Sequence, residues 1–191
     1  MGFCDKFKVD RVICDEIFYV EDDEFDVPIG EIVVPEGSVI GGTVTVTVLD
    51  CAPIVDIDED ELRANVVFMI QKELSIDTDP DDPEAPIIPL EFGFRLEREV
   101  TYRKCIPSQL AEIDPGLLEN LRCHIIHVQG TDEVNLTPSS DPQTKDATFD
   151  EFLTVQLKLK LVQERQMALS LCPGNQQVDI PAVQVENNIN G

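Results

Sequence analysis

Strict alternation of apolar and polar residues is the feature that most constrains this chain. Residues 43–48 set three valines against three threonines, and residues 152–161 alternate in the same way over a longer run. Successive side chains of a strand point to opposite faces, so this period gives one face for a core and one for solvent. Half-buried strands of this kind are typical of antiparallel sheets.

Five further segments carry weaker strand patterns between clusters of Pro, Gly, Asp and Ser: 9–20, 31–35, 62–76, 90–102 and 167–172. We expect acidic or polar loops at 21–26, 56–61, 77–84 and 130–148. Many strands with turn-rich gaps predict an all-β fold, an antiparallel β-sandwich with extended amino- and carboxyl-terminal arms. The expected organisation is an arm or first strand at 1–20, a sandwich domain at 21–173 and a polar tail at 174–191.

Residues 114–128 fit two structures. Asp114 followed by Pro115 is a helix-start signal, and positions 117, 118, 121, 125 and 128 would share a helical face. A strand over 121–128 fits nearly as well, and we favour the strand.

The charge balance bears on the classes of partner. Lys and Arg total 14 against 38 Asp and Glu, a net charge of −24 in 191 residues. Such a field opposes binding to nucleic acid or to an anionic membrane. We therefore expect neither partner.

Six cysteines stand singly along the chain: Cys4, Cys14, Cys51, Cys105, Cys123 and Cys172. None forms the CxxC spacing of zinc ribbons or redox sites. The start of the chain has no apolar signal region, so we expect synthesis in the cytosol, where thiols stay reduced. The cysteines are then either buried small hydrophobes or thiols that cross-link after the protein reaches an oxidising place. The sequence leaves their pairing open.

Sites for chemistry are sparse. His124 and His127 beside Cys123 invite a metal or thiol-enzyme interpretation, but on a strand residues three apart would point to opposite faces. The acidic loops 56–61 and 77–84 offer oxygen ligands of the kind that calcium takes, without completing the calcium-loop pattern. We expect no enzyme, no catalytic residue, no dedicated metal site and no cofactor, and leave weak calcium binding open.

The segment before residue 20 supports two interpretations. An arm carrying Cys4 and Cys14 could lie along the sheet edge of a neighbouring copy and be fixed there by a disulfide. Alternatively, residues 9–20 are the first strand of the chain's own sandwich.

From residue 39 to residue 172 the order of strands resembles the SPOCS-type spore coat domain of endospore-forming bacteria. The resemblance is carried by the alternation at 44–48, by Phe92-Gly93-Phe94 with Cys105-Ile106-Pro107 after it, by residues 117–128, and by the closing run 155–162 with Gln166 beyond it. Residues 8–14, with Cys4 upstream, are also similar to the start of endospore appendage subunits, a family that bridges protomers into fibres through arm cysteines.

These resemblances imply a structural protein made in the mother cell and deposited on the spore surface, as coat, exosporium or appendage. Its partners would be other copies of itself and other spore surface proteins. All six cysteines are candidates for inter-subunit disulfides, with Cys4 and Cys14 foremost. The alternative is an adaptor that tethers coat layers without polymerising, with its cysteines mostly buried and reduced.

Overall fold

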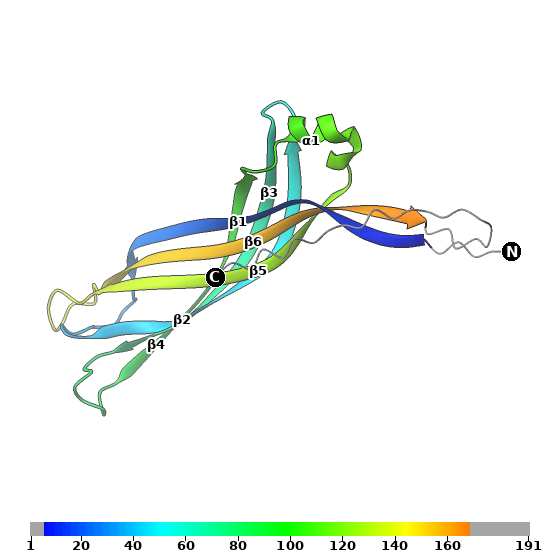
Figure 1. The fold of residues 1–191 in the computed structure, drawn as a ribbon. Helices are drawn as coiled ribbons and strands as arrows, with labels where there is room; N and C mark the ends of the chain where they lie inside the picture. Colours follow the sequence, from blue (N-terminus) through cyan, green and yellow to red (C-terminus); the bar gives the residue numbers. More distant parts are fainter. Residues whose placement is uncertain (1–5, 169–191) are drawn as a thin grey trace, which may run out of the picture. The chain divides into compact units, whose positions relative to one another are not determined.

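The computed structural model describes the backbone of residues 6–168 and the side chains of residues 9–164. The chain divides into two compact units, residues 10–165 and a second unit that combines 1–9 with 166–191. Of the second unit, only the strand ends 6–9 and 166–168 are described. The elements in chain order are β1 (Lys6–Pro28), β2 (Val39–Asp56), β3 (Glu61–Asp77), β4 (Ile87–Tyr102), α1 (Pro107–Ile113), the 3-10 helix η1 (Pro115–Leu118), β5 (Leu121–Thr137) and β6 (Thr148–Ala168) (Figure 1).

Two antiparallel three-stranded sheets pack against each other, which confirms the predicted all-β sandwich. One sheet has the order β1-β6-β5 and the other β2-β3-β4, so β6 and β3 are the central strands. β2, β3 and β4 form a continuous meander in which β3 pairs along nearly its whole length with both neighbours. β1, β2, β4 and β5 are the edge strands.

The central strands supply most of the core through the alternation seen in the sequence. The inward side chains of β3 from Leu62 to Ile70 are fully buried, and so are those of β6 from Leu153 to Leu161. Burying one such side chain stabilises the fold by roughly 1.5–3 kcal/mol. A second, smaller cluster gathers around Ile76 and Phe149.

The strand expected at 31–35 is wrong. This segment belongs to the connection between β1 and β2, where Gly30 and Gly37 adopt positive φ angles of 102° and 92°. Val34 is nevertheless fully buried. Its N–H donates to the hydroxyl of Ser139, and its carbonyl oxygen accepts a hydrogen bond from the N–H of Ser139. The residues look like a strand because Val34 is a core residue, but they sit in an anchored loop.

Two expected loops are largely strand. Residues 21–26 lie inside β1, where Asp22 accepts a hydrogen bond from Arg98 and Asp26 donates its N–H to Asp150. The expected loop at 130–148 shrinks to 138–147, since β5 continues to Thr137. In both cases the strand is rich in acidic and polar residues, so the sequence shows no clear alternation of apolar and polar positions there.

Residues 114–128 form a short helix followed by a strand. Asp114 caps η1 by accepting a hydrogen bond from the N–H of Gly116, but the helix ends after one turn at Leu118. β5 then begins at Leu121, which confirms the strand over 121–128.

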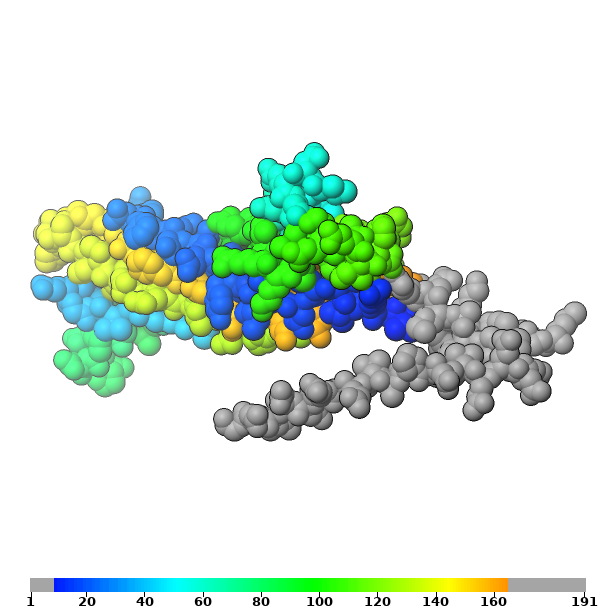
Figure 2. All heavy atoms as spheres, turned by 45° about the horizontal axis from the view of Figure 1, so that its top comes forward, coloured from blue at the N-terminus to red at the C-terminus, as the bar shows by residue number. Residues whose placement is uncertain are grey.

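Helix α1 was not expected from the sequence. It follows β4 and begins at Pro107, whose missing N–H costs nothing at a helix start. The N–H and hydroxyl of Ser108 both donate to Asp60 in the β2–β3 turn, at 2.7 and 2.6 Å. The green atoms of this helical region lie against the blue strand β1 in Figure 2. Arg11 of β1 and Asp114, which follows α1, form an ion pair at 4.0 Å.

Of the strand expected at 167–172, Met167 and Ala168 end β6 and the rest lies outside the described residues, as does the tail 174–191. Among the described residues, no helix has the length and apolar character needed to cross a membrane.

Candidate assembly site and covalent links

Four of the six cysteines pair within the chain. Cys14 bonds to Cys105 and Cys51 to Cys123, with Cα separations of 6.1 and 5.6 Å that are ordinary for disulfides. They join residues 91 and 72 positions apart in the sequence, so each closes a long loop.

The two disulfides lie on different sides of the sandwich, and each connects one sheet to the other. Cys51 is on β2 and Cys123 on β5, two edge strands of different sheets. Cys14 is on β1, and Cys105 follows β4, the edge strands of the other side. One disulfide therefore ties the two sheets together on each of the two open sides of the sandwich.

This arrangement changes the list of inter-subunit candidates. Cys14, Cys51, Cys105 and Cys123 are used inside one chain. Cys14 is buried on β1, so residues 9–20 form the first strand of the chain's own sheet. Cys4 and Cys172, one in each terminal segment, lie outside the described residues.

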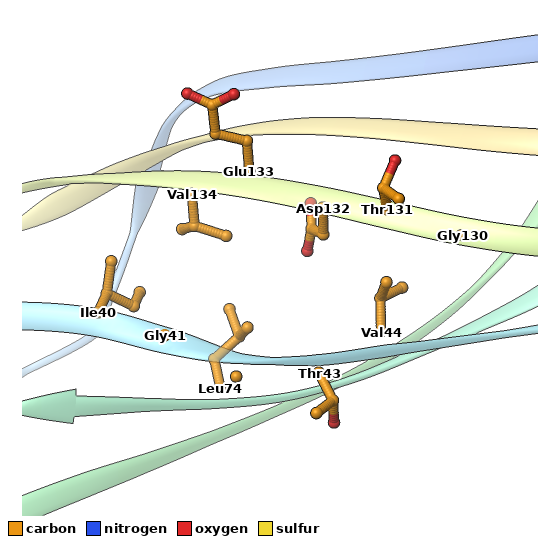
Figure 3. A pocket seen from close by; sticks show the side chains of 11 residues that line it. Ile40, Gly41, Thr43, Val44, Leu74, Gly130, Thr131, Asp132, Glu133 and Val134 are labelled. Atoms are coloured by element: carbon orange, nitrogen blue, oxygen red, sulfur yellow. The ribbon is translucent and has the colours of Figure 1, made fainter.

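A groove of about 640 Å³ runs between β2 and β5 (Figure 3). Val44 and Leu74 point toward it from one sheet, and Asp132 and Val134 point toward it from the other. Glu133 points away. The groove is lined by Ile40, Gly41, Gly42, Thr43, Val44, Leu74, Gly130, Thr131, Asp132, Glu133 and Val134.

Glycine sets how closely the two strands approach at one end of the groove. A Cβ atom on Gly130 would lie 2.4 Å from Cγ2 of Val46, which real structures do not tolerate. At Gly41 a Cβ atom would meet nothing within 4 Å. The two strands therefore approach each other closely at Gly130.

Both strands along the groove are sheet edges. β2 pairs with β3 and β5 pairs with β6, and the two belong to different sheets. Within residues 6–168 neither has a hydrogen-bonded strand on the groove side. An edge strand presents a row of backbone donors and acceptors that can pair with a further strand.

A buried charged cluster lies between the sheets beside this groove. The side chain of Lys72 is fully buried on β3, and its ammonium nitrogen is 3.1 Å from Oδ2 of Asp132 on β5. It also contacts Oε1 of Glu151 on β6. The two carboxylates are only 6 % and 5 % exposed.

Burial dominates the electrostatics of this cluster. Desolvation lowers the pKa of Lys72, and the carboxylate of Asp132 opposes that shift through a hydrogen bond and its charge. Apart from the 3.1 Å contact with Lys72, neither buried carboxyl oxygen of Asp132 has a hydrogen-bond partner among the described residues. Phe94 places its ring centre 5.7 Å from the lysine nitrogen. Lys72 therefore loses its proton more readily here than a lysine on the surface does.

His124 and His127 point to the same face of β5, contrary to expectation. A bulge at Ile126 shifts the register, so that His124 lies opposite Lys160 and His127 opposite Lys158. Both histidines are exposed, and the nearby thiol of Cys123 is used in a disulfide. No group of three or more metal ligands gathers within the described part of the chain.

The acidic loops use their carboxylates locally. Asp56 accepts hydrogen bonds from the N–H groups of Asp58 and Glu59 and pairs with Arg63 at 2.7 Å. In the second loop Asp79 accepts from the N–H of Asp81, and Asp82 does so from Glu84. These bonds shape the turns.

Lys72, Asp132 and Glu151 were not among the site residues predicted from the sequence. A signal was present for two of them, because Lys72 and Glu151 occupy inward positions in otherwise apolar alternation. Comparisons with protein-family models, with curated proteins and with solved structures found no match.

Proposed function

We propose that this chain is a self-assembling structural subunit of the bacterial endospore surface, joined to its neighbours through strand edges and disulfides. The resemblance of residues 39–172 to a spore coat domain supports the location. The observation that carries the assembly is the groove between β2 and β5, bordered by two strand edges without a pairing strand among the described residues. A sandwich with open edges can add a strand from another chain.

The proposed occupant is the carboxyl-terminal segment of a second copy. Residues 183–186 read Val-Gln-Val-Glu and alternate as a strand does. The groove offers apolar contacts at Val44, Leu74 and Val134 to the apolar face of such a strand. A contact of this type joins different surfaces of two copies, so it propagates into a fibre or sheet unless it closes into a ring.

Cys4 and Cys172 supply the covalent part of the proposal. They lie outside the described residues, and in the proposal they link neighbouring subunits, whereas the other four cysteines are paired within the chain. The high negative charge keeps free subunits apart until strand pairing provides enough binding energy.

The test is light scattering on the full-length protein with a bulky charged side chain on the β2 edge that borders the groove. Gly41→Lys is suited to this, because Gly41 lines the groove and a Cβ atom there would meet nothing within 4 Å. Gly93→Lys is the matched control, since Gly93 lies on the edge strand β4, outside the groove, and its Cβ would meet only an ordinary contact at 3.8 Å.

The proposal expects large assemblies for the wild type and for Gly93→Lys, and a marked loss of assembly for Gly41→Lys. Equal assembly of both variants would exclude the groove as the contact. A wild-type protein that stays monomeric at all concentrations would favour the adaptor, the alternative function suggested by the same resemblance.

A further inference from the structure

We propose that Lys72 and Asp132 join in an intramolecular isopeptide bond, with Glu151 as the proton carrier. The bond would link the Nζ atom of Lys72 to Cγ of Asp132 and release one water. It would connect the two sheets of the sandwich through a side-chain amide. The inference does not depend on the proposed assembly, because all three residues belong to one chain.

The geometry brings together the three groups that this reaction needs. Lys72 comes from the centre of one sheet, whereas Asp132 and Glu151 come from adjacent strands of the other. The amine nitrogen is 3.1 Å from Oδ2 of Asp132, so Cγ, the carbon bonded to that oxygen, lies close to the amine. It also contacts the carboxylate of Glu151, so one residue offers the electrophile and the other a base.

The surroundings favour the neutral amine form of Lys72. Lys72 has no exposed side-chain surface. It lines a cavity together with Phe92 and Phe149, whose ring centres are 5.8 Å apart. In the proposed reaction the ammonium of Lys72 first passes a proton to Asp132, which leaves a neutral amine and a neutral carboxylic acid in a place where charges are costly. Burial also lowers the pKa of Lys72, which acts in the same direction.

The bond-forming step balances without a further reagent. The lone pair of the Lys72 nitrogen attacks Cγ of the protonated Asp132 carboxyl group and forms a C–N bond. Glu151 takes a proton from that nitrogen and delivers it to the departing hydroxyl, which leaves as water when the C–O bond breaks. Glu151 returns to its carboxylate form, and nothing is oxidised or reduced.

The product water has an exit. Lys72 and Glu151 line a cavity of about 450 Å³ that also touches β1 and β4, while Asp132 lines the groove between β2 and β5. The cluster therefore lies between a cavity and a groove, and each gives the product water a path out of the core. Loss of water from the site makes the amide bond persistent.

The assignment of Asp132 as the electrophile rests on hydrogen bonding. Apart from the contact with Lys72, neither of its buried carboxyl oxygens has a hydrogen-bond partner among the described residues. Glu151 instead accepts a hydrogen bond from the amine, as a base must.

The experiment is an intact-mass measurement of the full-length protein after reduction and denaturation. The expected mass is that of the sequence less one water, and peptide mapping is expected to yield a branched peptide joining the segments around Lys72 and Asp132. A protein with the full sequence mass would overturn the proposal. A branched peptide joining Lys72 to Glu151 would overturn the assignment of the electrophile.

Variants separate this bond from other dehydrations. Lys72→Arg keeps a positive charge but offers no amine for the bond, so the missing water is expected to return. Lys158→Arg, on the outer face of β6, is the matched control and is expected to remain one water light. A missing water that persists in Lys72→Arg would place the dehydration elsewhere and overturn the proposal.

The other two members of the cluster give distinct mass signatures. Asp132→Asn is expected to lose ammonia instead of water, because an amide leaving group replaces the hydroxyl. Glu151→Gln is expected to retain its full mass, since the base is gone. If Glu151→Gln formed the bond at the wild-type rate, Glu151 would not be the proton carrier. None of these masses depends on whether subunits assemble, so failure here and failure of the proposed function are distinguishable.

Discussion

Removing one disulfide at a time is expected to destabilise the sandwich strongly. The bond between Cys51 and Cys123 closes a loop of 72 residues, and the bond between Cys14 and Cys105 closes one of 91 residues. In the chain-entropy treatment these loop lengths correspond to about 4.4 and 4.6 kcal/mol of stabilisation through the unfolded state. Both values are close to the whole free energy of unfolding of a marginal domain.

The perturbation is a pair of double variants, Cys51→Ser/Cys123→Ser and Cys14→Ser/Cys105→Ser, in the oxidised protein. Urea unfolding followed by circular dichroism gives the midpoint of each. With a slope of about 2 kcal/mol per molar urea, each variant is expected to unfold at a midpoint lower by about 2 M. The matched control is Cys4→Ser/Cys172→Ser, which leaves in place both disulfides of the described residues.

The argument predicts nearly equal losses for the two bonds, because free-energy loss grows only with the logarithm of loop length. An unchanged midpoint in either variant would refute the pairing or the role assigned to it. A peptide map of the oxidised wild type that joined Cys14 to Cys51 or Cys123 would refute the topology directly.

Two smaller predictions concern packing and pH. Gly130→Val is expected to lower the free energy of unfolding by about 1–3 kcal/mol through its clash with Val46, whereas Gly41→Ala, in open space, is expected to change it little; urea unfolding measures both. Desolvation by burial, reinforced by the carboxylate of Glu16, raises the pKa of Tyr102 above the ordinary value of 10.0. The unfolded chain therefore loses this proton first, so stability falls as pH rises above about 10, and Tyr102→Phe is expected to flatten that part of a stability curve measured against pH.

The fold class could be predicted from the sequence because the alternation of apolar and polar residues follows directly from the geometry of a strand. Every second residue of β3 and β6 must enter the core, and a period of two can be read without knowing the partners. The strand ends were harder, since acidic residues such as those at 21–26 mask the pattern. Val34 shows the converse error, as a buried side chain in a loop fixed by Ser139 resembles a short strand.

The candidate sites depended on long-range geometry, which single-sequence reasoning does not contain. Six cysteines allow many full pairings, and only the fold brings Cys51 beside Cys123. The bulge at Ile126 put both histidines on one face, and no local pattern announces a bulge. By contrast, Lys72 at an inward position of an apolar strand was a readable anomaly, because a charge there requires a partner.

The measurement that tests the proposed assembly most directly is a denaturing gel of the oxidised protein, run with and without reductant. The account predicts a ladder, or material too large to enter the gel, that collapses with reductant to a band of 21.3 kDa. It also predicts that Cys4→Ser/Cys172→Ser removes the ladder, while the Cys51→Ser/Cys123→Ser variant keeps it. A single monomer band in both lanes would contradict the account, because no covalent link between subunits would then exist.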